Sequence, residues 1–131
     1  MSDGHDRNGT IRALVVDDER NILFVFYHAL KCLGERYQIE TASRAEEALE
    51  KLDQESFQLL ITDLKMPGMG GIALTELLRE RKAALPIVWI TAYSSPFVRR
   101  RARELNVFTC LDKPVEVSTI RATALAALMP L

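Results

Sequence analysis

The chain has 131 residues, of which 48% are hydrophobic and 27% are charged, and its formal net charge is -1. This balance is typical of one folded globular domain and excludes a largely disordered chain. The near-zero charge argues against nonspecific nucleic-acid binding by the whole domain, although it leaves room for a local basic patch.

Signals for targeting and for cysteine chemistry are weak in this sequence. Residues 1–10 are polar and contain Gly, Asp, Asn and Ser, which predicts a flexible lead-in without a signal peptide, followed by one domain over residues 11–131. The longest apolar stretches are far too short to span a membrane. Cys32 and Cys110 lack metal-type spacing and favour two reduced, buried thiols, so we expect a cytoplasmic protein.

The first half of the chain alternates strand and helix patterns. The first strand stays apolar over its last residues, so we expect it to be covered on both faces. Apolar residues at helical spacing follow it, and Ser43 with Glu46 forms a capping-box pattern at the start of the second helix. The predicted elements are a strand at Ile11–Val16, a helix at Arg20–Leu33, a strand at Tyr37–Thr41, a helix at Ser43–Leu52 and a strand at Phe57–Thr62.

The second half continues the alternation. Pro86 begins a strand, where its missing N–H donor is tolerated, and Ser95 followed by Pro96 predicts a helix start. The remaining predicted elements are a helix at Gly71–Lys82, a strand at Pro86–Thr91, a helix at Pro96–Leu105, a strand at Val107–Leu111 and a helix at Val115–Met129. Five strands alternating with five helices predict an α/β fold, a (βα)5 chain with a parallel sheet and helices on both faces.

Polar side chains follow four of the five predicted strands. Ligands of such sheets bind outside the carboxyl ends of the strands. The residues at these ends are Asp17 and Asp18 after the first strand, Asp63 after the third, Thr91 after the fourth and Lys113 after the fifth. Each alone has an ordinary explanation, such as a cap of the next turn. Their convergence on one edge favours a functional site.

The charge of this predicted site points to a cation. Three carboxylates and one lysine leave an excess of negative charge, and two like charges about 4 Å apart cost roughly 4 kcal/mol at an effective dielectric of about 20. Hard oxygen ligands favour Mg2+, which keeps several waters for a phosphate ligand. A phosphoryl group entering the site would be balanced by Mg2+ and Lys113.

These residues resemble the receiver (REC) domains of two-component response regulators, in the CheY-like superfamily. The resemblance covers roughly Arg12 to Met129. It rests on the pair Asp17-Asp18, on Asp63 in Thr-Asp-Leu-Lys-Met-Pro-Gly, on Thr91 in Thr-Ala-Tyr, and on Lys113-Pro114. It implies a doubly wound, flavodoxin-like three-layer sandwich whose five-stranded parallel sheet has the order 2-1-3-4-5.

The resemblance also implies a phosphoacceptor and its metal ligands. Asp63 would attack the phosphohistidine of a sensor histidine kinase or phosphotransfer protein and form an aspartyl phosphate, within a two-component phosphorelay. Asp18 and Asp63 would bind Mg2+ directly, Asp17 through water, and the Lys65 backbone carbonyl would be a further ligand. The domain would catalyse only its own phosphorylation and dephosphorylation, so it is not expected to be an enzyme in the usual sense.

A second group of residues would read the phosphoryl group. Lys113 would pair with the phosphoryl oxygens, and Thr91 would swing its hydroxyl onto them, which starts the switch. The peptide between Lys113 and Pro114 is expected to be cis for a positional reason. Cys110 stands where the family usually carries Tyr or Phe, so the usual coupling of Thr91 to an aromatic ring is in question.

Two surface features have a functional and an ordinary interpretation. Tyr93 and Lys65 are near enough to gate water at an acyl phosphate, and they are equally well explained as loop side chains. Four arginines crowd the fourth helix, at Arg99, Arg100, Arg101 and Arg103. Such a run favours a solvated face, and the alternative is a partner surface or a phosphorylation-dependent homodimer.

Two other function classes fit the sequence less well. A Mg2+-dependent phosphatase with an aspartyl nucleophile usually needs a second Asp two residues later, where this chain has Lys65. A receiver-like module that binds partners without phosphorylation is disfavoured by the intact Asp18, Asp63, Thr91 and Lys113. No effector domain follows the last helix, which fits a stand-alone receiver or the first part of a longer regulator. A stand-alone receiver would act by protein contact, since it lacks a helix for reading nucleic acid.

Overall fold

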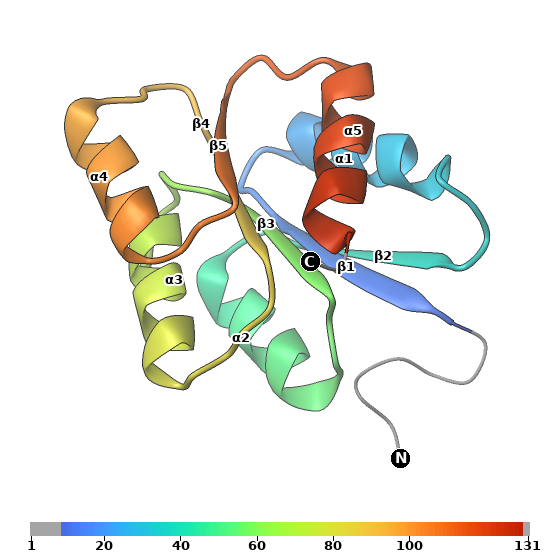
Figure 1. Ribbon diagram of the computed structural model, residues 1–131, viewed down its shortest axis with the longest axis horizontal. Helices are drawn as coiled ribbons and strands as arrows, with labels where there is room; N and C mark the ends of the chain where they lie inside the picture. The colour runs from blue at the N-terminus through green and yellow to red at the C-terminus, as the bar shows by residue number, and fades with distance from the viewer. Residues whose placement is uncertain (1–8, 130–131) are drawn as a thin grey trace.

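A computed structural model describes residues 9–129, and its five strands and five helices alternate from end to end (Figure 1). In chain order they are β1 (Ile11–Val16), α1 (Arg20–Lys31), β2 (Tyr37–Ala42), α2 (Ala45–Gln54), β3 (Leu59–Asp63), α3 (Gly71–Glu80), β4 (Ile87–Thr91), α4 (Pro96–Glu104), β5 (Thr109–Asp112) and α5 (Val117–Leu128). All pairings are parallel, in the order β2-β1-β3-β4-β5. The predicted (βα)5 fold and strand order are confirmed.

The helices form the outer layers of a three-layer sandwich. Helices α1 and α5 cover one face of the sheet, and α2, α3 and α4 cover the other (Figure 1). Side chains of β3 alternate between these layers, with Leu60 packed toward α2–α4 and Ile61 toward α1 and α5. Every residue of β3 and β4 is buried. The last residues of these strands, Asp63 and Thr91, are therefore held by a packed core.

The start of α2 differs from the sequence prediction. Arg44, not Ser43, is the N-cap residue, and no side chain caps the helix. The N–H and hydroxyl of Ser43 both donate to Oε1 of Glu47, at 2.9 and 3.2 Å. The predicted cap is wrong because Glu47, three residues after Arg44, reaches back to the turn before the helix. The cap predicted for α4 is confirmed, since Ser95 Oγ accepts from the N–H of Val98 at 3.1 Å.

The start of β5 also differs. The strand begins at Thr109, two residues later than the apolar pattern suggests. The N–H of Val107 donates to the carbonyl of Ala102 at 2.9 Å, and Asn106 has a left-handed φ of 55°. Val107 therefore closes the end of α4 and does not begin the strand. The other element boundaries differ by up to two residues, which is within the usual fraying of element ends.

The two cysteines have different environments. Cys32 is exposed at the end of α1, and Cys110 is half-buried in β5. The prediction of two buried thiols is wrong for Cys32, because Ala29 and Leu30 face the core and Cys32 falls on the other side of α1.

The chain ends lie partly outside the described residues. Residues 1–8 of the predicted lead-in are not described, whereas the carbonyl of Gly9 accepts a hydrogen bond from Arg36 Nε at 3.1 Å. Over residues 9–129, no helix combines the length and apolar character needed to cross a membrane.

Candidate functional site

Four strand ends meet at one edge of the sheet, as the sequence predicts. Asp63 and Thr91 are the last residues of β3 and β4, and Lys113 follows β5 directly. The backbone N–H of Lys113 donates to the carbonyl of Thr91 at 2.8 Å, which fastens the end of β5 to that of β4. Together these ends enclose a small hollow of about 240 Å³, lined by Asp18, Glu19, Asp63, Lys65, Thr91, Ala92, Tyr93 and Lys113.

Three carboxylates converge at this hollow. Asp17, Asp18 and Asp63 each offer an oxygen atom within 4.8 Å of the others, and they are the one such group found among residues 9–129. Asp17 is fully buried, Asp63 is 5% exposed, and Asp18 is open to solvent. The N–H of Glu19 donates to Asp17 Oδ1, and that of Leu64 to Asp63 Oδ1, both at 2.9 Å. The Oδ2 atoms of Asp17 and Asp63 are left for other partners.

Lys113 is a cation that Asp17 and Asp63 share. Its Nζ lies 3.1 Å from Asp17 Oδ2, 3.2 Å from Glu19 Oε1 and 3.5 Å from Asp63 Oδ2. The buried Asp17 Oδ2 has only this ion-pair contact and no hydrogen bond of good geometry. The peptide before Pro114 is cis, as expected.

Burial and charge act against each other on these groups. Burial raises the pKa of Asp17 and of Asp63 above that of an ordinary aspartate, and the neighbouring carboxylates raise it further, while Lys113 opposes the rise. Burial alone would lower the pKa of Lys113, but its contacts with Asp17, Glu19 and Asp63 raise it. The buried, unsatisfied Oδ2 of Asp17 and the excess of hard oxygen donors fit a divalent metal ion.

The predicted switch residues lie in different places. The hydroxyl of Thr91, which is 4% exposed, accepts a hydrogen bond from the backbone N–H of Tyr93 at 3.0 Å. Tyr93 is 74% exposed at the rim, and the Nζ of Lys65 lies 5.7 Å from the centre of its ring. Cys110 lies in register with Trp89, away from the hollow, and burial raises the pKa of its thiol.

Two features of the site were missed by sequence reasoning. Glu19 competes with the aspartates for Lys113, and its signal was its place as the third acid in Asp17-Asp18-Glu19. Gly71 packs against the Asp63 backbone, where a Cβ atom would lie 2.1 Å from the carbonyl oxygen. Its signal was a glycine at the first residue of a predicted helix.

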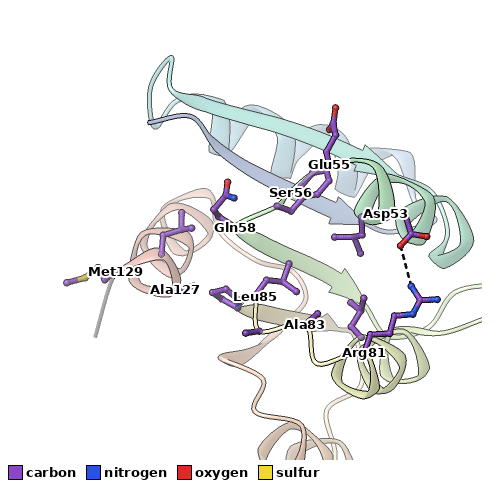
Figure 2. Close-up of a pocket in the computed structure, with 15 residues that line it drawn as sticks. Asp53, Glu55, Ser56, Gln58, Arg81, Ala83, Leu85, Ala127 and Met129 are labelled. Carbon is purple, nitrogen blue, oxygen red and sulfur yellow. Dashed lines mark hydrogen bonds and ion pairs between the residues drawn. The ribbon is translucent and has the colours of Figure 1, made fainter. Parts of the chain in front are cut away.

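A larger hollow lies at the opposite edge of the sheet. It is a groove of about 600 Å³ at the amino ends of β3 and β4, and Figure 2 shows Asp53 and Arg81 paired at one end of it. The atoms of that pair are 3.4 Å apart. None of the predicted site residues lines this groove.

Comparison with known proteins identifies the domain. A family model for the response regulator receiver domain matches residues 13–125. The chain belongs to the response regulator receiver domain family. The fold of this receiver domain is similar to that of the chemotaxis protein CheY4 of Vibrio cholerae, with a TM-score of 0.84 and 29% identity over 91% of this chain and 99% of that one.

Longer relatives contain a similar domain. The receiver domain is 32% identical to sensor histidine kinase RcsC of Salmonella typhimurium over 118 residues, which cover 90% of this chain and 12% of the relative. It is 33% identical to the alkaline phosphatase synthesis transcriptional regulatory protein PhoP of Bacillus subtilis over 117 residues, which cover 89% of this chain and 48% of PhoP. The chain thus spans less than two thirds of either relative.

These matches confirm the predicted family and its place in two-component signalling. Receiver domains are the phosphoacceptor modules of that signalling, and the relatives include a sensor histidine kinase and a transcriptional regulatory protein.

Proposed function

We propose that Asp63 is the phosphoacceptor of this receiver domain and that Mg2+ at the acidic cluster assists the transfer. The observation that carries the proposal is a carboxylate at the end of β3 that lines the hollow and has one oxygen 3.5 Å from Lys113 Nζ. Asp17 is not among the lining residues, and the exposed Asp18 has no comparable contact with Lys113. Asp63 alone combines access, burial and a cation beside it.

The reaction is an in-line transfer from a phosphohistidine. An oxygen of Asp63 attacks the phosphorus, the new O–P bond forms as the P–N bond breaks, and the leaving imidazole nitrogen keeps the electron pair and takes a proton from solvent. Bound Mg2+ supplies charge neutralisation at the phosphoryl oxygens. Lys113 exchanges its contact with Asp63 Oδ2 for one with a phosphoryl oxygen. The hydroxyl oxygen of Thr91 accepts from the N–H of Tyr93, so its hydrogen is available to donate to a second phosphoryl oxygen.

The proposed metal ligands have unequal support. Asp18 and Asp63 would bind the ion directly, Asp17 would act through water, and the Lys65 carbonyl would be a further ligand. The mutual approach of the three carboxylates within 4.8 Å supports a shared ion. The contact of Asp17 with Lys113 supports a less direct role for that residue. The role of the Lys65 carbonyl stays a prediction.

The output surface is proposed on α4. This helix buries only Ala102, and Arg99, Arg100 and Arg103 are exposed, while Arg101 pairs with Glu76 on α3 at 2.5 Å. Contact with an effector, and a phosphorylation-dependent homodimer, stay predictions. A cytoplasmic location, the absence of direct nucleic-acid binding and a catalytic role limited to its own phosphorylation and dephosphorylation stay predictions as well.

Intact mass spectrometry tests the proposal. We expect wild-type protein with Mg2+ and acetyl phosphate to gain one phosphoryl group per chain, and Asp63→Asn to gain none. Asp53→Asn, which removes an exposed carboxylate at the opposite edge, is the matched control and retains the adduct. Multiple turnover of a small phosphoester would indicate a phosphatase. Absence of any adduct on wild-type protein would indicate a module that works without phosphorylation.

A further inference from the structure

A buried hydrogen-bond chain links β4 to α3 behind the site. Trp89, the single tryptophan, donates from its indole Nε1 to Thr75 Oγ1 at 2.9 Å. The Thr75 hydroxyl donates in turn to the carbonyl of Gly71 at 2.8 Å. Both side chains are fully buried, so these bonds have no competition from water. The hydroxyl of Thr75 therefore acts as acceptor and donor at once.

One end of this hydrogen-bond chain contacts the backbone of Asp63, the proposed phosphoacceptor. Gly71 begins α3 and packs directly on the peptide between Asp63 and Leu64, with no space for a side chain. The N–H of Gly71 donates to the carbonyl of Leu64 at 3.0 Å, and Thr62 Oγ1 donates to the carbonyl of Asp63 at 2.8 Å. The first turn of α3 therefore contacts the backbone of Asp63 directly.

The other end of the chain leads to Thr91. Trp89 lies opposite Thr62 in the register of β3 and β4, two residues before Thr91 on the same strand. The bond between Trp89 and Thr75 therefore connects the strand that carries Thr91 with the helix that bears on Asp63. Asp63 and Thr91 both line the hollow.

The ordinary interpretation is that the bond only satisfies a buried indole. A buried tryptophan N–H needs an acceptor, and a threonine within a helix often bonds to the carbonyl four residues earlier. The placement favours a larger role, because Thr75 bonds to Gly71, which packs on the Asp63 backbone, and Trp89 lies two residues before Thr91 on β4. We propose that the pair Thr75 and Trp89 positions Asp63 relative to Thr91 for phosphoryl acceptance. This inference rests on the proposed function.

Rates of phosphorylation at saturating acetyl phosphate and Mg2+ test the pair. Thr75→Val keeps the shape of the side chain and removes the hydroxyl, whereas Thr75→Ser keeps the hydroxyl. We expect Thr75→Val to lower the maximal rate by roughly tenfold with little change in the half-saturating donor concentration. Thr75→Ser should stay within about twofold of wild type. Trp89→Phe should also lower the rate as a single substitution. The double variant Thr75→Val with Trp89→Phe should be no slower than Thr75→Val, because both changes remove the same bond.

The outcomes separate this inference from the proposed function. If wild-type protein forms no adduct, the proposed function fails. If Thr75→Val only lowers the melting temperature and keeps the wild-type rate, the bond is structural and the inference is overturned. Equal rate losses in Thr75→Val and Thr75→Ser would also overturn it, since the hydroxyl would then be irrelevant. Should Thr75→Val fail to fold, a slow Trp89→Phe beside a normal Thr75→Ser supports the inference, and a normal Trp89→Phe overturns it.

Discussion

The hollows at the two edges of the sheet differ in volume and in the charge balance of the side chains around them. The carboxyl edge holds the smaller hollow, of about 240 Å³, and the amino edge holds a groove of about 600 Å³ (Figure 2). At the amino edge, opposite charges meet at exposed or half-exposed positions, as in Arg81 with Asp53 and Arg12 with Glu55. At the carboxyl edge, Lys113 alone forms ion pairs with Asp17, Asp63 and Glu19 among the described residues.

The difference shows which feature marks a functional edge. Exposed ion pairs contribute little to stability and attract no further ligand, however large the groove beside them. Buried carboxylates in excess of cations lower stability until a cation or a proton joins them. The unbalanced charge at the smaller hollow, more than its volume, therefore supports the proposal that a metal ion and a phosphoryl group bind there.

The largest expected effect comes from neutralising one carboxylate at each edge. Asp17→Asn removes a fully buried charge whose pKa burial has raised, so we expect the free energy of unfolding without metal to rise by about 1 to 2 kcal/mol. Asp53→Asn removes an exposed partner of Arg81 and should change it by less than about 0.5 kcal/mol. Urea denaturation in the presence of a chelator measures both. Equal effects at the two edges would show that the charge imbalance is not a source of instability.

A second expected effect is stabilisation by Mg2+ that depends on pH. The pKa of Asp17 and of Asp63 is raised in the folded protein, so their protons contribute stability at low pH that is lost as the pH rises through the folded pKa. In the proposed site, Mg2+ would replace those protons. We expect Mg2+ to raise the melting temperature by about 3 to 5 °C at about pH 8 and by much less at about pH 4, close to the ordinary aspartate pKa.

Thermal unfolding with Mg2+ or with a chelator checks this dependence. The variant Asp17→Asn should show a smaller change between the two pH values. A Mg2+ effect of the same size at both would contradict the proposed competition between the metal ion and protons.

The smallest expected effect concerns Glu19. Its side chain is 63% exposed and lies 3.2 Å from Lys113 Nζ, a contact worth less than about 1 kcal/mol. Glu19→Gln frees the ammonium for the incoming group, so we expect adduct formation with acetyl phosphate to speed up by about twofold. Glu55→Gln at the amino edge is the control, with an unchanged rate. A slower reaction of Glu19→Gln would show that Glu19 assists the site.

The fold and the main site residues could be predicted because both follow from local patterns. Continuous apolar runs marked the central strands, and parallel strands place their carboxyl ends on one edge. Asp63, Thr91 and Lys113 each stand at the end of such a run, so their convergence needed no knowledge of side-chain contacts.

The remaining features depend on contacts between distant residues. The approach of Glu19 to Lys113 joins residues 94 positions apart, and the bond between Trp89 and Thr75 joins residues 14 positions apart. No local pattern encodes either contact. The predicted helix cap at Ser43 was wrong for a related reason, because the backbone N–H of Ser43 donates to the side chain of Glu47. Sequence reasoning thus predicted which residues converge at the candidate site and missed the contacts between distant residues around it.

Chemical trapping of the phosphoryl group tests the central claim most directly. An aspartyl phosphate is reduced by borohydride to homoserine, which peptide mass spectrometry can assign to one position. After wild-type protein reacts with Mg2+ and acetyl phosphate, we predict homoserine at Asp63 and unmodified Asp17 and Asp18. Homoserine at Asp17 or Asp18, or an adduct formed equally well in a chelator, would contradict the account.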